Sequence, residues 1–203
     1  MATLSDERIK QLLQPYVGDA GSASLYSQLS VYLDLLLKWN AKTNLTAIRE
    51  PEEIVQRHFG ESLFAGRQLS PCRTLLDYGS GAGFPGVPIQ LLRPEVAVTL
   101  AESQNKKATF LREVVRSLGL STEVWGKRVG EMPATRTFDA VCMRAVDSME
   151  MAMPEAGSRV SRGGELLVLA TELAVPEGGK LVRMPQSDSG VVFVRTFHVE
   201  HLA

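Results

Sequence analysis

Residues 77–86 read Asp-Tyr-Gly-Ser-Gly-Ala-Gly-Phe-Pro-Gly, and this glycine-rich turn is the strongest indication of the fold. It follows an apolar run at 74–78 that predicts a β-strand, and it precedes a predicted helix at 88–92. Glycine residues let the chain turn sharply and let its backbone approach a ligand that a β-carbon would repel. Four glycines within eight residues, between a strand and a helix, favour a nucleoside-cofactor site over a purely structural turn.

The segments that follow this turn alternate between strand and helix patterns. Further strands are predicted at 96–101, 123–125, 138–143 and 165–170. A helix is expected between Asn105, which can cap it, and Gly119, which can stop it. Such alternation is typical of an α/β protein with a doubly wound, mostly parallel sheet and helices on both faces. Two more strands, 180–184 and 191–198, are expected to pair as a hairpin at the sheet edge.

The first 70 residues read as helical. Ser22 opens a helix whose apolar residues recur on one stripe: Leu25, Leu29, Tyr32, Leu33, Leu36 and Trp39. Pro51, followed by two glutamates, begins another helix. We therefore expect two parts, a helical segment at 1–70 packed on a Rossmann-like core at 71–203.

The residues around the turn distinguish between possible cofactors. Glu102 ends the next strand, 19 positions after Gly83, where a carboxylate can accept hydrogen bonds from ribose hydroxyls. Pro85 and Pro88 remove backbone N–H groups that a pyrophosphate would need. Asp77 would repel phosphate and suit a cationic ligand. These features favour S-adenosylmethionine (SAM), which carries a sulfonium and no phosphate, over NAD, and an NAD-dependent oxidoreductase stays as an alternative.

Composition sets broader limits. The chain has 203 residues, 44% of them hydrophobic, and a net charge of −1. It has no apolar run of 18 residues, and its first residues lack the pattern of a signal peptide. The two cysteines, Cys72 and Cys142, match no zinc or redox spacing. We therefore expect a cytoplasmic protein with no membrane span and no metal.

Positive charge is concentrated in one stretch. Residues 104–144 carry eight Lys or Arg against four acids, which permits a phosphate-facing patch or simply a set of solvated helix faces. Lys106 and Lys107 stand at the start of a predicted helix, where cations oppose the helix dipole. We expect these two lysines and Arg112 to help bind RNA.

The turn also carries a more specific signal. Its extension, Phe84-Pro85-Gly86-Val87-Pro88, is similar to the cofactor loop of the RsmG (GidB) family of bacterial methyltransferases. Further matches run in order along the chain: Lys38-Trp39-Asn40, Asn44-Leu45-Thr46, Arg57-His58, Glu61-Ser62, Glu102-Ser103, Lys106-Lys107, Phe110-Leu111-Arg112 and Arg144-Ala145. They cover roughly residues 38–170, so the chain resembles this family over most of its length.

The resemblance implies a class I SAM-dependent methyltransferase that methylates N7 of a loop guanine in 16S ribosomal RNA. It implies 16S ribosomal RNA or the 30S subunit as partner, and we expect a monomer. It places around SAM the residues Gly79, Gly81, Phe84, Glu102, Val129, Gly130 and Arg144, with Glu102 on the ribose. Arg144 would also serve as the catalytic residue between cofactor and substrate. Guanine N7 has a free lone pair and no proton to lose, so its methylation needs alignment rather than a general base.

The sequence departs from the family pattern at two single residues and one pair. Glu61 stands where the family usually has aspartate, and Gly130 stands where it often has an acid. Ala170-Thr171 replaces a Lys-Gly pair after the fifth strand of the core. A methyltransferase with another substrate, or a non-catalytic RNA-binding protein with this fold, therefore stays open.

Three polar residues in the family motifs have simpler interpretations. His58 is more often a structural histidine than a catalyst. Asn40 and Asn44 are at least as well explained as helix caps as by contact with RNA.

Overall fold

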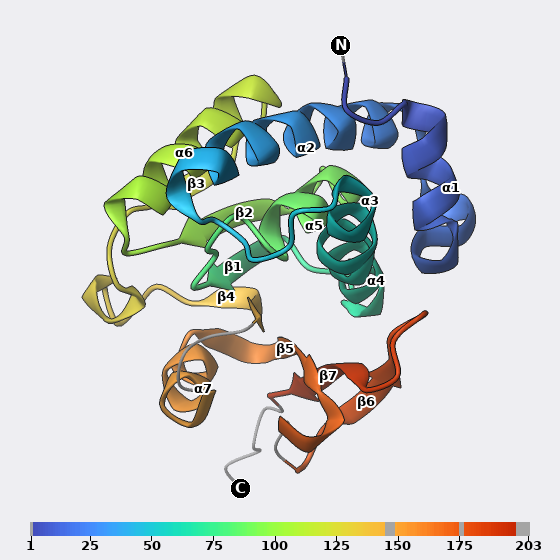
Figure 1. The fold of residues 1–203 in the computed structure, drawn as a ribbon. Coiled ribbons are helices and arrows are strands. Elements are labelled where there is room, and N and C mark those ends of the chain that lie inside the picture. Colours follow the sequence, from blue (N-terminus) through green and yellow to red (C-terminus); the bar gives the residue numbers. More distant parts are fainter. Residues whose placement is uncertain (1, 145–148, 175–176, 198–203) are drawn as a thin grey trace, which may run out of the picture.

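The computed structural model describes residues 2–144, 149–174 and 177–197 and contains one seven-stranded sheet (Figure 1). The strands lie in the order β3-β2-β1-β4-β5-β7-β6. Their bounds are β1 (Thr74–Tyr78), β2 (Ala97–Ala101), β3 (Glu123–Trp125), β4 (Phe138–Arg144), β5 (Val160–Thr171), β6 (Lys180–Arg183) and β7 (Gly190–Thr196). Strands β1 to β5 pair in parallel, whereas β7 runs antiparallel to both β5 and β6. The predicted α/β class and mostly parallel sheet are confirmed.

Helices cover both faces of this sheet (Figure 1). They are α1 (Asp6–Val17), α2 (Ala23–Thr43), α3 (Pro51–Glu53), α4 (Glu61–Gln68), α5 (Gly86–Leu92), α6 (Asn105–Ser117) and α7 (Met149–Ser158), with a π-helix at Ile54–Gly60 between α3 and α4. Ser22 caps α2 as predicted, because its side chain accepts a hydrogen bond from the Leu25 amide. The predicted cap of α6 was wrong by one residue, since Gln104 is the capping position and Asn105 is already helical.

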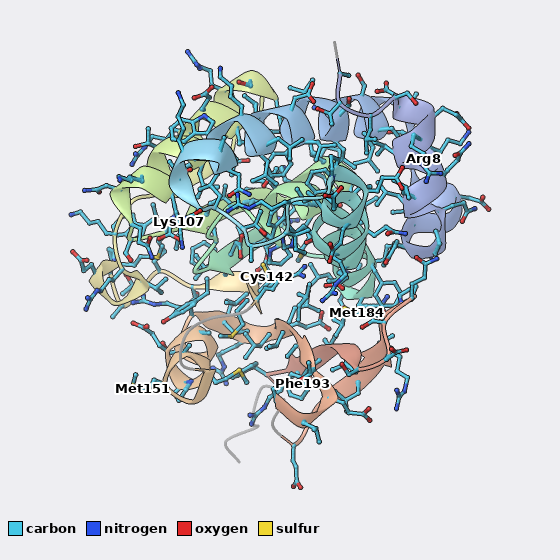
Figure 2. The ribbon with its side chains drawn as sticks, viewed as in Figure 1. Arg8, Lys107, Cys142, Met151, Met184 and Phe193 are labelled. Carbon is cyan, nitrogen blue, oxygen red and sulfur yellow. The ribbon has the colours of Figure 1, made fainter. Side chains whose placement is uncertain are left out.

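The core has two buried clusters, one on each face of the sheet. The larger joins the predicted stripe of α2 to apolar residues of α1, α4, α5 and α6 and to β-strand residues such as Leu75 and Leu100. The smaller packs α7 against the other face and contains Phe193 (Figure 2). Because the N-terminal helices share one core with the sheet, the division at residue 70 into two parts stays a prediction.

The glycine-rich loop between β1 and α5 is held from two sides. Below it, the buried Asp77 carboxylate accepts a hydrogen bond from the Gly86 amide at 3.0 Å. Above it, the Tyr32 hydroxyl donates to the carbonyl of Ala82. A β-carbon at Gly83, where φ is +96°, would lie 2.5 Å from the Tyr32 oxygen. Helix α2 therefore fixes the loop directly, and this links the N-terminal helices to the turn.

The two last strands form the expected hairpin at the sheet edge. Strand β6 pairs with β7, and β7 pairs with β5. The predicted end of the second strand, His198, lies outside the described residues. Among the described residues, we find no helix that is both long enough and apolar enough to cross a membrane.

The buried Asp77 predicts a pH-dependent stability. Burial raises the pKa of this carboxyl to about 7. Its pKa in the unfolded chain is about 3.9, so the folded state binds the extra proton between these values. The contribution of Asp77 to the free energy of unfolding should therefore fall as the pH rises from about 4 to 7 and level off above 7. Urea titrations should show the wild type losing roughly 2–3 kcal/mol more than Asp77→Asn between pH 5 and pH 8. Equal losses in the two proteins would contradict the assignment.

Candidate active site

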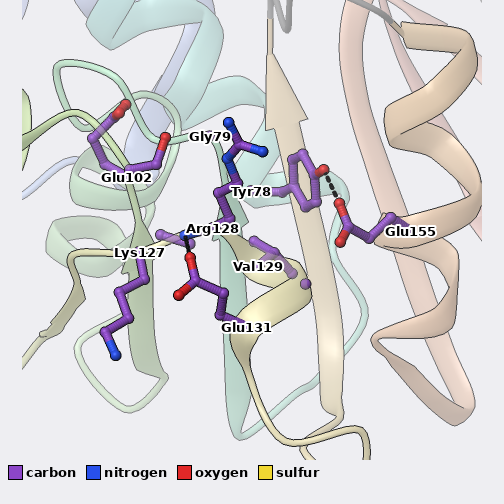
Figure 3. A pocket seen from close by; sticks show the side chains of 11 residues that line it. Tyr78, Gly79, Glu102, Lys127, Arg128, Val129, Glu131 and Glu155 are labelled. Atoms are coloured by element: carbon purple, nitrogen blue, oxygen red, sulfur yellow. Dashed lines mark hydrogen bonds between the residues drawn. The ribbon is translucent and has the colours of Figure 1, made fainter.

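Two adjoining cavities open where the parallel strands end. Cavity A has a volume of about 440 Å³, and its lining residues are Tyr78, Gly79, Ala101, Glu102, Ser103, Lys127, Arg128, Val129, Gly130, Glu131 and Glu155 (Figure 3). Cavity B has a volume of about 340 Å³, and its lining residues are Leu45, Thr46, His58, Gly79, Ser80, Gly81, Ala82, Phe84, Glu102, Ser103, Gln104, Lys107 and Arg144. The cavities share Gly79, Glu102 and Ser103. All seven residues predicted at the site thus line one or both cavities.

The glycines of the loop have different surroundings. A β-carbon at Gly86 would lie 2.6 Å from the Asp77 carboxylate, so this glycine and Gly83 serve packing within the protein. Among the described residues other than the chain neighbours of Gly81, only the Gly79 carbonyl oxygen would lie within 4 Å of a β-carbon at Gly81, at 3.9 Å. Gly81 has a φ of +59° and faces cavity B. Its open side leaves room for a ligand to approach the backbone.

Glu102 stands at the boundary between the two cavities. One carboxylate oxygen accepts a hydrogen bond from the Gly81 amide at 2.9 Å, and the other accepts from the Gln104 amide at 2.7 Å. A carboxylate oxygen can accept a second hydrogen bond, so both oxygens can also bind ligand hydroxyls. Asp77 behaves differently from the expectation, because its carboxylate lies buried under the loop and lines neither cavity. Glu102, rather than Asp77, supplies negative charge to the site.

Arg144, at the end of β4, is held by a buried ion pair. Its guanidinium lies 2.7 Å from a carboxylate oxygen of Glu61, the first residue of α4. The other Glu61 oxygen accepts from Arg57 Nε at 3.1 Å, and the Arg57 carbonyl accepts from Arg144 at 2.9 Å. Only 15% of the Arg144 side chain and 8% of the Glu61 side chain are exposed. Glu61, which departs from the family's aspartate, therefore fixes the arginine that faces cavity B.

His58 forms part of the wall of cavity B. Its ring stacks on Phe84 with centroids 4.7 Å apart, and its Nε2 lies 2.6 Å from the Thr46 hydroxyl. Burial, together with the charges of Arg144 and Arg57, lowers the pKa of His58 to about 3. The imidazole is therefore neutral at physiological pH and is a poor proton acceptor. Its contacts agree with the structural interpretation.

The two asparagines of the family motifs hold the chain beside cavity B. The buried Asn40 side chain donates to the Thr46 carbonyl and accepts from the Thr46 amide, both at 3.0 Å. Asn44 ends α2 in a left-handed conformation, as a C-cap. Lys107 lines the same cavity, whereas Lys106 is exposed and Arg112 lies beside Gly126.

Two features of the site had no signal in the sequence. Glu155 reaches cavity A from α7, which follows β4 in the chain. Cavity C, of about 380 Å³, lies on the other side of Arg144 and is bounded by Glu61 and by the end of β5 at Ala170 and Thr171. Both depend on contacts between segments distant in sequence.

In the described part of the chain, no group of three or more His, Cys, Asp or Glu side chains could hold a metal ion.

The Arg144–Glu61 pair predicts a large effect on stability. Glu61→Ala leaves the Arg144 charge buried without its partner, and such changes cost about 3 kcal/mol or more. Urea unfolding at pH 7 should show this loss of free energy, and Glu61→Asp should recover part of it. The matched control is Glu52→Ala, which breaks an exposed pair with Arg8 and should change the unfolding midpoint little. A small effect of Glu61→Ala would show that the pair does not stabilise the site.

Several solved structures with a similar fold are described as methyltransferases. A ribosomal protein methylase from Lactobacillus delbrueckii superimposes with a TM-score of 0.58 at 11% identity, covering 71% of this chain and 80% of that one. The Thermus thermophilus 16S rRNA methyltransferase RsmC, in complex with AdoMet and guanosine, gives a TM-score of 0.51 at 15% identity, with 71% and 41% covered. At such identities the likeness establishes the class I methyltransferase fold, as predicted.

Curated relatives are much more similar in sequence. The chain is 43% identical over 142 residues to ribosomal RNA small subunit methyltransferase G of Xylella fastidiosa, which covers 70% of this chain and 66% of that protein. It is 42% identical to the protein of that name from Clostridium perfringens, covering 66% and 59%. The chain thus spans less than two thirds of the length of these relatives. The GidB family model, described as rRNA small subunit methyltransferase G, matches residues 25–201. The chain therefore belongs to the GidB family, as its motifs predicted.

Proposed function

We propose that this protein is a SAM-dependent methyltransferase that methylates N7 of a loop guanine in 16S ribosomal RNA. One observation carries the proposal. In a member of the GidB family, the open face of Gly81, the Glu102 carboxylate and the Arg144 guanidinium all line cavity B, at the carboxyl ends of three neighbouring strands, and Glu102 also lines the adjoining cavity A. In open α/β sheets, ligands bind at this edge.

The residues present fit SAM. Glu102 offers acceptors for ribose hydroxyls where the two cavities adjoin, Gly81 offers open backbone beside it, and Gly79 lines both cavities. Val129 and Gly130 border the far part of cavity A, where the adenine would lie. When bound, SAM supplies an electrophilic methyl group, which N7 accepts through its lone pair while the sulfonium sulfur keeps the electrons of the broken C–S bond.

The protein's own residues would act by position and charge. Arg144 is fixed by Glu61 at the border between cavities B and C, where it can orient the base. The methylated guanine carries a positive charge, and the Glu61 carboxylate beside the two arginines offsets their repulsion of it. No proton must leave N7, which agrees with a neutral His58 that is too weak a base to take one.

The RNA would lie along the side of the molecule where α2 and α6 run next to each other. The Trp39 indole donates to Glu113 at 3.0 Å, so the C-terminal part of α2 lies beside the middle of α6 (Figure 1). Three exposed lysines lie on these two helices: Lys38 and Lys42 in α2, and Lys106 in α6. Lys107, which Figure 2 labels, is half-buried and lines cavity B. The proposal includes 16S ribosomal RNA or the 30S subunit as partner, a cytoplasmic location and a monomeric protein.

The open face of Gly81 predicts a selective loss of binding. Gly81→Val places a side chain in cavity B, so calorimetry should show SAM affinity lowered by tenfold or more. Gly119→Val is the matched control, since Gly119 also has a positive φ (+64°) and open space but lies at the end of α6, away from the cavities. The control separates backbone strain from loss of the site. Equal SAM affinity in both variants would refute a cofactor over Gly81.

The reaction itself predicts one product. Undermethylated 30S subunits, incubated with the protein and tritiated SAM and digested to nucleosides, should yield labelled N7-methylguanosine by mass spectrometry. Because N7 does not titrate near neutral pH, the initial rate should vary less than about threefold between pH 6.5 and 8.5. A different methylated nucleoside would refute the N7 assignment, and transfer only to protein or small molecules would refute the RNA substrate.

A further inference from the structure

Cavity A contains a carboxylate that the family resemblance does not account for. Glu155 enters it from α7, on the side away from Glu102 (Figure 3). The Tyr78 hydroxyl donates to Glu155 Oε2, and no described residue donates to Oε1. Burial and the neighbouring carboxylate raise the pKa of Tyr78 to about 12, so the phenol keeps its proton and remains a donor. Glu155 is thus anchored through one oxygen, and the other is free to bind a ligand.

Gly130 makes room for this carboxylate. A β-carbon at position 130 would lie 2.7 Å from Glu155 Oε1, closer than van der Waals contact allows. Any side chain at 130 would therefore displace the Glu155 carboxylate. The family often has an acidic residue at the position of Gly130. This chain lacks an acid there, and the Glu155 carboxylate from α7 lies next to that position instead.

The other acids of cavity A are differently engaged. Both oxygens of Glu102 already accept backbone amides. Glu131 is exposed, and its Oε1 accepts from the Arg128 amide. Only Glu155 combines partial burial, an anchoring hydrogen bond and a free oxygen beside Val129 and Gly130.

We propose that Glu155 Oε1 accepts a hydrogen bond from the exocyclic 6-amino group of the adenine in cavity A, and so selects a 6-aminopurine ligand. The inference rests on the proposed function, since it takes the ribose to lie at Glu102. A base attached to that ribose extends toward Val129 and Gly130. A carboxylate is an acceptor only, so it pairs with an amino group and repels the carbonyl of a 6-oxopurine.

Calorimetry with two ligands tests this assignment. S-adenosylhomocysteine carries an amino group at purine C6, whereas S-inosylhomocysteine carries an oxo group at C6 and a proton on N1. The wild type should prefer the adenine ligand by about tenfold or more, as expected for a hydrogen bond to a charged group. In Glu155→Gln the preference should fall to within about threefold, because an amide can accept from the amino group or donate to the oxo group. Glu131→Gln, the matched control at the rim of the same cavity, should keep the full preference.

A second variant covers the case in which Glu155→Gln does not fold. Gly130→Ala keeps Glu155 but pushes its carboxylate aside, and it should reduce the preference in the same way. The inference is overturned if the wild type binds both ligands alike, or if a folded Glu155→Gln or Gly130→Ala keeps the full preference. If the wild type binds neither ligand, the proposed function fails and the inference fails with it.

Discussion

The hydrogen bond between the Asp77 carboxylate and the Gly86 amide is the constraint on which the rest of the site depends. It closes the glycine-rich loop onto the end of β1 and keeps a polar group satisfied in the centre of the core. The same loop is held from above by Tyr32 of α2, whose hydroxyl binds Ala82. With both sides fixed, Gly81 is left with its open face toward the cavities and its amide on Glu102. Because this loop is already ordered, little binding free energy is lost to ordering it when a ligand binds.

The Arg144–Glu61–Arg57 network plays the corresponding role on the substrate side. It joins the end of β4 to the π-helix and α4, so the N-terminal helices position a residue of the sheet. Two guanidinium groups alone would oppose the charge that a methylated base acquires. The buried carboxylate between them reduces that opposition and holds Arg144 at the border of two cavities. The N-terminal helices and the sheet therefore both position residues of the site.

Much of this arrangement follows from local sequence patterns. The strands, the amphipathic stripe of α2 and the glycine loop have periodic or compositional signals, and the predicted cofactor residues end parallel strands that meet at one edge. Asp77 was expected to act on the ligand through its charge, but it lies buried outside both cavities, because the sequence does not show that the loop folds back over it. Glu155 and cavity C were missed because they depend on how α7 and the hairpin pack, over separations that no local pattern encodes. Gly130 was noted as a departure, but only the structure shows which side chain fills its space.

A crystal structure of the protein with S-adenosylhomocysteine would show directly where the cofactor binds. We expect one ligand that spans cavities A and B, with its ribose hydroxyls on Glu102, its amino-acid end over Gly79 and Gly81, and its adenine beside Val129 and Glu155. Asp77 should stay bonded to Gly86, unchanged under the loop. A ligand bound in cavity C, or one that reaches its site only after the glycine loop has opened, would contradict a preformed cofactor site at Gly81 and Glu102.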